Sequence, residues 1–239
     1  MTIALLNNVD HHDLRVITRH GAEFGEAVNQ VLVFPTEFEE IQRHYPIVFR
    51  RDSEGALRPV ALLGFARDEN LFLDDTGEWW ARYVPALFER GPFSIAAPEA
   101  PDGEPMIRID LDHPRVSRSD GCAIFLPQGG NSPYLEQVTA VLRAIYLGHH
   151  LLEPMMAAFE AAGLLREVNL EARVGENEIY AVTGASTIDR ERLAALSASE
   201  LADLHRGGFL QAAFFAAASL GNMQRLADIK GRAMTGAGA

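Results

Sequence analysis

Two side chains near the start of the chain have the spacing of a metal site. His11 and Asp13 stand in an H-x-D pattern, the near half of the facial triad that holds ferrous iron in 2-oxoglutarate oxygenases. Such a triad takes its second histidine from a later strand, and His113 or His149 would be the candidates. It also needs a double-stranded β-helix of about eight strands, and fewer strands are expected in this interval. The pattern leaves an iron-dependent oxygenase as an alternative, while the sequence predicts no metal site and no cofactor.

The densest aromatic cluster of the chain, residues 79–93, is the candidate binding surface. As core residues, its aromatic side chains would anchor a helix on a sheet. As a surface, they would line an apolar groove for a peptide or protein, with the arginines as anion clamps. An acidic, amide-bearing rim at residues 68–70 precedes the cluster. The predicted binding residues are Trp79, Trp80, Arg82, Tyr83, Arg90 and Phe93, with Glu69 and Asn70 from the rim.

The charge balance and the rare residue types exclude several classes of function. The chain has 33 acidic against 21 basic residues and a net charge of −12, which argues against binding nucleic acid or an anionic membrane surface. Its one lysine, Lys230, lies in a segment expected to fray, so Schiff-base chemistry is excluded, and no P-loop motif is present. The one cysteine, Cys122, cannot form an internal disulfide or a multi-thiolate zinc site, and we expect it to be a buried strand residue.

Hydropathy predicts no membrane span. The longest nearly apolar run, residues 209–220, is too short to cross a bilayer, and no signal-peptide pattern opens the chain. The sequence therefore predicts a cytoplasmic protein.

The order of turns and apolar runs predicts an α+β fold. Residues 1–132 are expected to form a lobe rich in antiparallel strands with two short helices. One helix would begin at Thr36, capped through Glu39, and the other would cover residues 79–89. The expected strands are residues 28–34, 47–49, 58–65, 70–73, 94–97, 106–111 and 121–126.

Residues 133–239 are expected to form a mainly helical lobe that completes one compact unit. The pattern predicts a long helix from Pro133 to about residue 163, kinked or split at Pro154, and then a β-hairpin. The hairpin strands would be residues 165–174 and 179–182, with a turn at 175–177. A short helix capped by Asp189 or Ser197 and an apolar helix at residues 204–225 would follow.

An ordered set of motifs resembles one known family. The helix-to-strand segment 34–49 is followed by Ala61-Leu-Leu-Gly-Phe, Glu69-Asn-Leu-Phe and the tryptophan-rich segment 79–85. This set resembles the SapC family, named after a protein of a bacterial surface-layer locus, over nearly the whole chain. A weaker C-terminal block contains Ile188-Asp189, Leu193, Leu201 and Ser219-Leu220.

The chain departs from that family at two places. Ala185-Ser186 stands where better-known members have an aromatic Phe-Tyr pair before Ile-Asp, and Phe214-Phe-Ala216 stands where they have Tyr-Ala-His. Any activity that depends on that tyrosine or histidine would be absent here.

The resemblance implies a bacterial accessory protein. Members of the family are often encoded beside cupin-like hydroxylases, flavin-type halogenases and outer-membrane receptors, so the expected partner is a peptide, a neighbouring-gene hydroxylase or halogenase, or a surface protein. Two alternatives stay open: the oxygenase built on His11 and Asp13, and a structural homo-oligomer or homodimer. The homo-oligomer would use the C-terminal helix, where Phe209, Phe214 and Phe215 stand among alanines.

Overall fold

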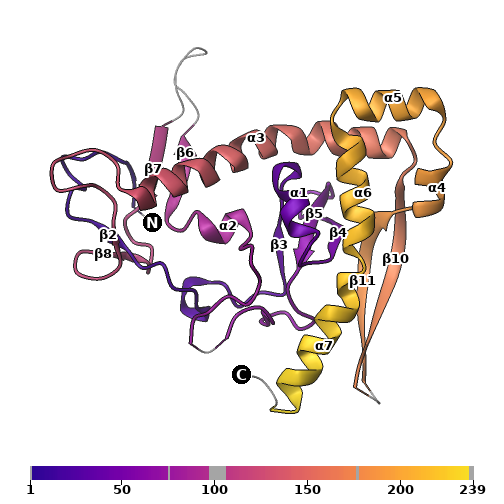
Figure 1. Cartoon of the computed structure of the whole chain (residues 1–239), viewed down its shortest axis with the longest axis horizontal. Helices are drawn as coiled ribbons and strands as arrows, with labels where there is room; N and C mark the ends of the chain where they lie inside the picture. The colour runs from indigo at the N-terminus through magenta and orange to yellow at the C-terminus, as the bar shows by residue number, and fades with distance from the viewer. Residues whose placement is uncertain (1, 75, 97–105, 176–177, 237–239) are drawn as a thin grey trace.

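A computed structural model describes residues 2–74, 76–96, 106–175 and 178–236 and confirms the α+β class. Antiparallel strands form three sheets, and a long helix, α3 (Pro133–Ala161), runs along one side of the molecule (Figure 1). The helix connects a small strand-rich part, which contains the N-terminus, with a larger part built on the central sheet.

The central sheet has five strands in the order β10-β11-β4-β5-β3, all antiparallel to their neighbours. Its strands are β3 (Gln30–Leu32), β4 (Ile47–Arg51), β5 (Leu57–Leu62), β10 (Leu165–Val174) and β11 (Glu178–Ile188). The predicted β4–β5 hairpin is present. Its turn is closed by Asp52, whose Oδ1 accepts the backbone N–H groups of Glu54 and Ala56 at 2.9 Å each.

Helix α6 (Phe209–Ser219) packs on β4 and β11. Four of its alanines are buried, and small side chains let a helix approach a sheet closely: Ala212, Ala213, Ala216 and Ala217. At its end, the Ser219 hydroxyl accepts the backbone N–H of Ile47 at 2.8 Å and donates to the carbonyl of Ala216 at 2.7 Å. The start of β4 is therefore fixed to the end of α6.

Two smaller sheets share a hydrophobic cluster with the N-terminal half of α3. One has the order β1-β7-β6 and the other β8-β2-β9. Their strands are β1 (Ile3–Leu5), β2 (Arg15–Val16), β6 (Phe93–Ala96), β7 (Met106–Asp110), β8 (Val116–Ser117) and β9 (Cys122–Ala123). Cys122 is exposed, so the expectation of a buried cysteine is wrong.

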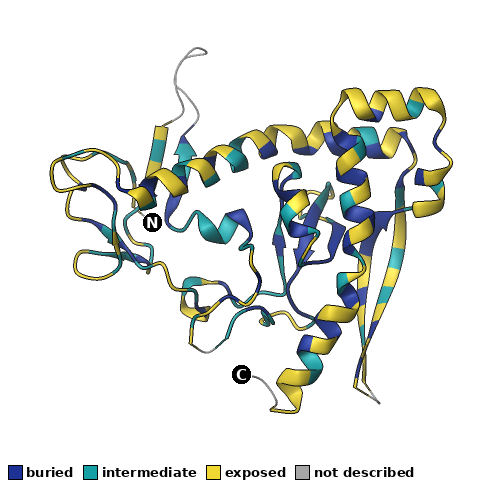
Figure 2. Ribbon diagram, viewed as in Figure 1, coloured by how far each residue is buried: buried dark blue, intermediate teal, exposed yellow. Residues whose placement is uncertain are grey.

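Helix α3 carries buried positions along its length (Figure 2), and these contribute to two separate hydrophobic cores. Leu135, Val138 and Leu142 from its first half join the small sheets, whereas Met155 and Phe159 from its second half join the central sheet. Phe159 meets Phe49 of β4 edge-on, with ring centroids 6.0 Å apart. Both cores thus draw residues from either side of residue 132, and the division of the chain at that residue stays a prediction.

The tryptophan-rich segment is helical only at its end. Trp79 forms an isolated antiparallel bridge with Leu73, and helix α2 covers only Ala86–Glu89, directly after Pro85. The helix predicted over residues 79–89 is therefore wrong in its first half. The expected strand at 70–73 is reduced to that bridge.

The helix predicted to start at Thr36 is capped by other residues. A 3-10 turn, η2 (Pro35–Glu37), leads into α1 (Phe38–Ile41), and the Glu37 carboxylate accepts the N–H of Phe34 at 3.0 Å. The Thr36 hydroxyl instead donates to the carbonyl of Ala144 in α3 at 2.9 Å. The predicted capping box of Thr36 and Glu39 is wrong because this contact with α3 takes the hydroxyl. An earlier 3-10 turn, η1, covers Ala22–Phe24.

The C-terminal elements follow the predicted order but differ in their bounds, and β11 runs to Ile188 instead of ending at Val182. α3 is not split at Pro154, whereas a kink there stays a prediction, and the helix expected at 204–225 is divided by Gly207-Gly208 and Gly221. The helices are α4 (Arg190–Ala194), α5 (Ala198–Arg206), α6 and α7 (Asn222–Met234). Asp189 caps α4 and Ser197 caps α5, so both proposed caps are used. Most of the predicted turn at 175–177 lies outside the described residues.

Candidate functional site

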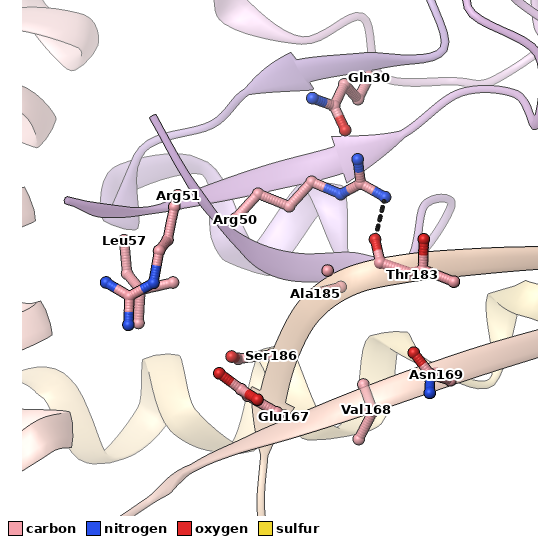
Figure 3. Close-up of a pocket in the computed structure, with 11 residues that line it drawn as sticks. Gln30, Arg50, Arg51, Leu57, Glu167, Val168, Asn169, Thr183, Ala185 and Ser186 are labelled. Atoms are coloured by element: carbon pink, nitrogen blue, oxygen red, sulfur yellow. Dashed lines mark hydrogen bonds between the residues drawn. The ribbon is translucent and has the colours of Figure 1, made fainter. Parts of the chain in front are cut away.

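A pocket of about 760 Å³ lies where the central sheet opens between β4 and β11 (Figure 3). We call it the inter-strand pocket, and its volume falls within the roughly 300–1,000 Å³ typical of ligand sites. Its lining residues are Gln30, Arg50, Arg51, Leu57, Glu167, Val168, Asn169, Thr183, Gly184, Ala185 and Ser186.

The sheet opens because β4 and β11 are paired at one position. Their register contains the single pair Ser186 and Phe49, whereas β4 pairs with β5 from Ile47 to Arg51. Beyond Phe49, the edge of β4 that is not bonded to β5 therefore faces the pocket. The edge of β11 that is not bonded to β10 faces it from the other side.

A bulge in β11 accounts for the divergence. Val168 of β10 pairs with Ala185 and Leu170 pairs with Val182, so two residues of β11 oppose one of β10. One of these two, Gly184, has φ +64°, a left-handed conformation that glycine adopts without a steric penalty. A bulge of this kind bends its strand and increases its twist, which turns β11 away from β4 at the pocket.

Arg50 reaches across the opening. Its Nη2 donates to the carbonyl oxygen of Thr183 at 3.0 Å, and the guanidinium lies between Gln30 and Thr183 (Figure 3). Its Nε is buried and has no acceptor among the described residues. Burial lowers the pKa of the half-buried Arg50 side chain. Among the described residues, no carboxylate forms an ion pair with this guanidinium.

The other polar groups of the pocket make it a site for charge and hydrogen bonding. Arg51 is exposed and donates to the carbonyl of Gly55 at 2.8 Å. Glu167 is exposed on the β10 wall, and the buried Oε1 of Gln30 has no donor among the described residues. The lining carries two guanidinium groups against one carboxylate, a local excess of positive charge in a chain of net charge −12.

Trp79 and Phe93, two of the predicted binding residues, are buried in different cores. Trp79 lies in the large core, where its Nε1 donates to the Tyr45 hydroxyl at 2.7 Å, and Phe93 lies in the small core. Trp80 is 47% exposed and Arg82 is also exposed. A binding role for Trp80 and Arg82 stays a prediction.

Tyr83 and Arg90 are partly buried and bonded within the fold. The Tyr83 hydroxyl donates to Oε2 of Glu37 at 2.9 Å, and burial, together with the nearby Glu37 charge, raises the pKa of Tyr83. Nη1 of Arg90 donates to the carbonyl of Phe93 at 2.6 Å, and burial lowers the pKa of Arg90. The Tyr83 contact joins segment 79–93 to η2, and the Arg90 contact lies within that segment.

Glu69 and Asn70 hold the loop that follows β5. Glu69 accepts Nζ of Lys230 at 2.5 Å and the backbone N–H of Phe65 at 2.9 Å. Asn70 donates to the carbonyl of Glu26 at 2.8 Å. Lys230 lies within α7, so the expectation that it sits in a fraying tail is wrong. None of the eight predicted binding residues lines the inter-strand pocket.

The H-x-D residues are engaged with other partners. Nδ1 of the buried His11 lies 3.2 Å from the N–H of Asn7, and Asp13 pairs with Arg118, whose hydrogen bond lowers the pKa of Asp13. His149 is exposed on α3 and not on its buried face as expected. In the part of the chain that the structure describes, no three His, Cys, Asp or Glu side chains are grouped to hold a metal ion.

The inter-strand pocket was not predicted from the sequence. One signal for it was available, because an isolated glycine within a strand pattern indicates a bulge, and Gly184 stands in the strand that forms the pocket wall. The segment predicted for this strand ended at Val182, just before that glycine.

A comparison with protein-family models gives a match over most of the chain. A family model described as SapC matches residues 6–226, which includes every residue of the inter-strand pocket. No curated protein and no solved structure matches the chain. None of the helices in the described ranges combines the length and the hydrophobicity that a membrane span requires.

Proposed function

The chain belongs to the SapC family, and on this premise we propose that it is an accessory protein that binds an extended peptide segment of a protein partner in the inter-strand pocket. The observation that carries the proposal is the single pairing of β4 with β11 at Phe49 and Ser186. Strand edges without a neighbour recruit extended peptides through main-chain hydrogen bonds, a mode known as β-augmentation.

The lining supports this mode of binding. Thr183 and Asn169 are exposed on the β10–β11 wall and Arg51 is exposed on the β4 wall, so a segment between the walls would meet polar groups on both sides. The lining side chains beside these strand edges would contact alternate side chains of the segment and give specificity.

The expected biological setting belongs to the same proposal. It comprises a bacterial, cytoplasmic accessory role and a partner such as a neighbouring-gene hydroxylase, a halogenase or a surface protein. The surface at residues 79–93, with Trp80 and Arg82 exposed, is the competing location for partner binding.

A displayed library of random dodecapeptides, selected on the immobilised full chain, tests the proposal. We expect enriched peptides to bind the protein in solution and to lose affinity when alternate backbone nitrogens are methylated, since methylation removes main-chain donors. Failure to enrich any peptide above the bare matrix would contradict the proposal.

Two tryptophan substitutions locate the site. Thr183→Trp places an indole in the pocket at an exposed strand position and leaves the backbone carbonyl that Arg50 contacts. We expect it to weaken peptide binding at least tenfold. Ile179→Trp, at an exposed position of the same strand outside the lining, is the matched control and should bind as the parent does. Loss of binding in Trp80→Ala or Arg82→Gln, with Thr183→Trp unaffected, would move the site to residues 79–93.

A further inference from the structure

Among the described residues, Arg50 is a half-buried cation with no anion beside it, a property that it shares with Arg15 and Arg90. Of these three arginines, Arg50 is the one that lines the inter-strand pocket. Other half-buried or buried cations have an anion partner. Arg58 is bonded to Asp52 at 3.1 Å, Arg115 to Glu26 at 2.5 Å and Lys230 to Glu69 at 2.5 Å. In the described residues, Arg50 makes one side-chain hydrogen bond, to a neutral carbonyl. Since a partly desolvated charge is unfavourable without a counter-charge, the position is suited to an anion supplied from outside the chain.

Arg50 also stands where a ligand can reach it. It lines the inter-strand pocket, whereas Arg58, directly opposite it in the β4–β5 register, does not. The guanidinium bridges the gap between β4 and β11 through the Thr183 carbonyl. A peptide that pairs with β11 would compete for this carbonyl and would release the Nη2 donor toward itself.

The charge of the lining indicates which anion fits. Two arginines and one glutamate give a formal charge of +1 (2 − 1), which one carboxylate neutralises. A phosphate group carries about −1.5 to −2 at pH 7 and would be repelled more strongly by Glu167 on the opposite wall. The planar guanidinium also matches a carboxylate in a two-point hydrogen-bonded pair.

We infer that the segment bound in the inter-strand pocket carries one carboxylate, which pairs with the Arg50 guanidinium. This inference rests on the proposed function. The carboxylate can come from an aspartate or glutamate side chain or from the C-terminus of the segment, and the experiment separates the two.

The test uses peptides enriched on the parent protein, each prepared as matched acid and amide forms. One pair exchanges the acidic side chain for its amide, and the other exchanges a free C-terminus for an amidated one. A lost hydrogen bond between charged groups corresponds to about a 10- to 100-fold loss of affinity. We expect this loss for one pair on the parent protein and less than twofold on Arg50→Gln.

Arg58→Gln is the matched control, and it should discriminate acid from amide as the parent does. Arg50→Lys keeps the positive charge but loses the planar two-point hydrogen-bonding geometry of the guanidinium, so it should retain part of the preference for the acid form. It provides a second variant if Arg50→Gln does not fold. Equal affinity for acid and amide forms, with Thr183→Trp still weakening binding at least tenfold, would overturn the inference and leave the proposed function standing. An acid preference that survives in Arg50→Gln would also overturn it. Absence of any peptide binding would overturn the proposed function itself.

Discussion

At the scale of single residues, the carboxylate of Glu37 joins three segments. Glu37 is 4% exposed, and it accepts the N–H of Phe34 at 3.0 Å, the N–H of Ala86 at 3.0 Å and the hydroxyl of Tyr83 at 2.9 Å. It thereby links the η2 turn, the start of α2 and the tryptophan-rich segment. Tyr83, predicted as a binding residue, is thus part of this internal network.

Replacing Glu37 by glutamine should destabilise the fold. The amide keeps one acceptor oxygen and turns an NH₂ group toward a donor, which leaves buried donors unsatisfied. We expect Glu37→Gln to lower the free energy of unfolding by about 2–3 kcal/mol, measured by urea denaturation. Glu39→Gln, at an exposed position two residues away, should change it by less than about 0.5 kcal/mol. Equal effects of the two variants would contradict the role given to Glu37.

The same carboxylate predicts a pH dependence. Burial raises the pKa of Glu37 above its ordinary 4.5, although its three hydrogen bonds oppose the shift. In the window above pH 4.5, the folded state therefore binds more protons than the unfolded state, so the free energy of unfolding falls as pH rises. The stability difference between the parent and Glu37→Gln should shrink with rising pH across this window, by at most about 1.4 kcal/mol per pH unit. A difference that grows with pH would show that hydrogen bonding outweighs burial.

At the scale of elements, α3 depends on a glycine to approach η2. A β-carbon added at Gly148 would lie 2.5 Å from Cβ of Phe34 and 2.6 Å from Oγ1 of Thr36. The bond from Thr36 to the carbonyl of Ala144 depends on this close approach. A larger residue at position 148 would push η2 away from the helix.

Two glycine-to-alanine substitutions in helices should therefore have opposite effects on the stability of the protein. Gly148→Ala should destabilise the protein by about 1–3 kcal/mol through overpacking, despite the better helix propensity of alanine. Gly231→Ala in α7 meets its nearest side-chain atom, Cγ1 of Val174, at 3.7 Å and should stabilise by about 0.5–1 kcal/mol. Thermal melting of both variants measures the two effects. A stabilising Gly148→Ala would contradict the close packing of α3 on η2.

Elements set by local pattern could be predicted from the sequence, and those set by distant contacts could not. Local sequence encodes the helical spacing of apolar residues in α3, the β10–β11 hairpin and the helix caps Asp189 and Ser197. The hydroxyl of Thr36 bonds to a residue 108 positions away, and no local spacing encodes that contact. The inter-strand pocket combines a bulge in β11 with the edge of β4, so it too depends on distant parts of the chain.

At the scale of the whole molecule, α3 is shared by two hydrophobic cores of unequal size. The small core contains the first half of α3 and residues from the two small sheets, and the large core contains the central sheet and the C-terminal helices. The boundary between the two cores therefore falls within α3. The predicted division of the chain at residue 132 is a different boundary, just before this helix. Regions with fewer buried apolar contacts open at lower free energy.

Hydrogen exchange should separate the two cores. Leu142→Ala removes a side chain that is 2% exposed in the small core, and such truncations cost about 2–5 kcal/mol. We expect it to accelerate exchange of the β6–β7 amides and to leave the β4–β5 amides unchanged, because the small core can open while the large core stays folded. Ile47→Ala, at a fully buried position of the large core, should accelerate β4–β5 and leave the faster β6–β7 amides unchanged. If either substitution accelerated both hairpins equally, α3 would instead couple the two cores into one cooperative unit.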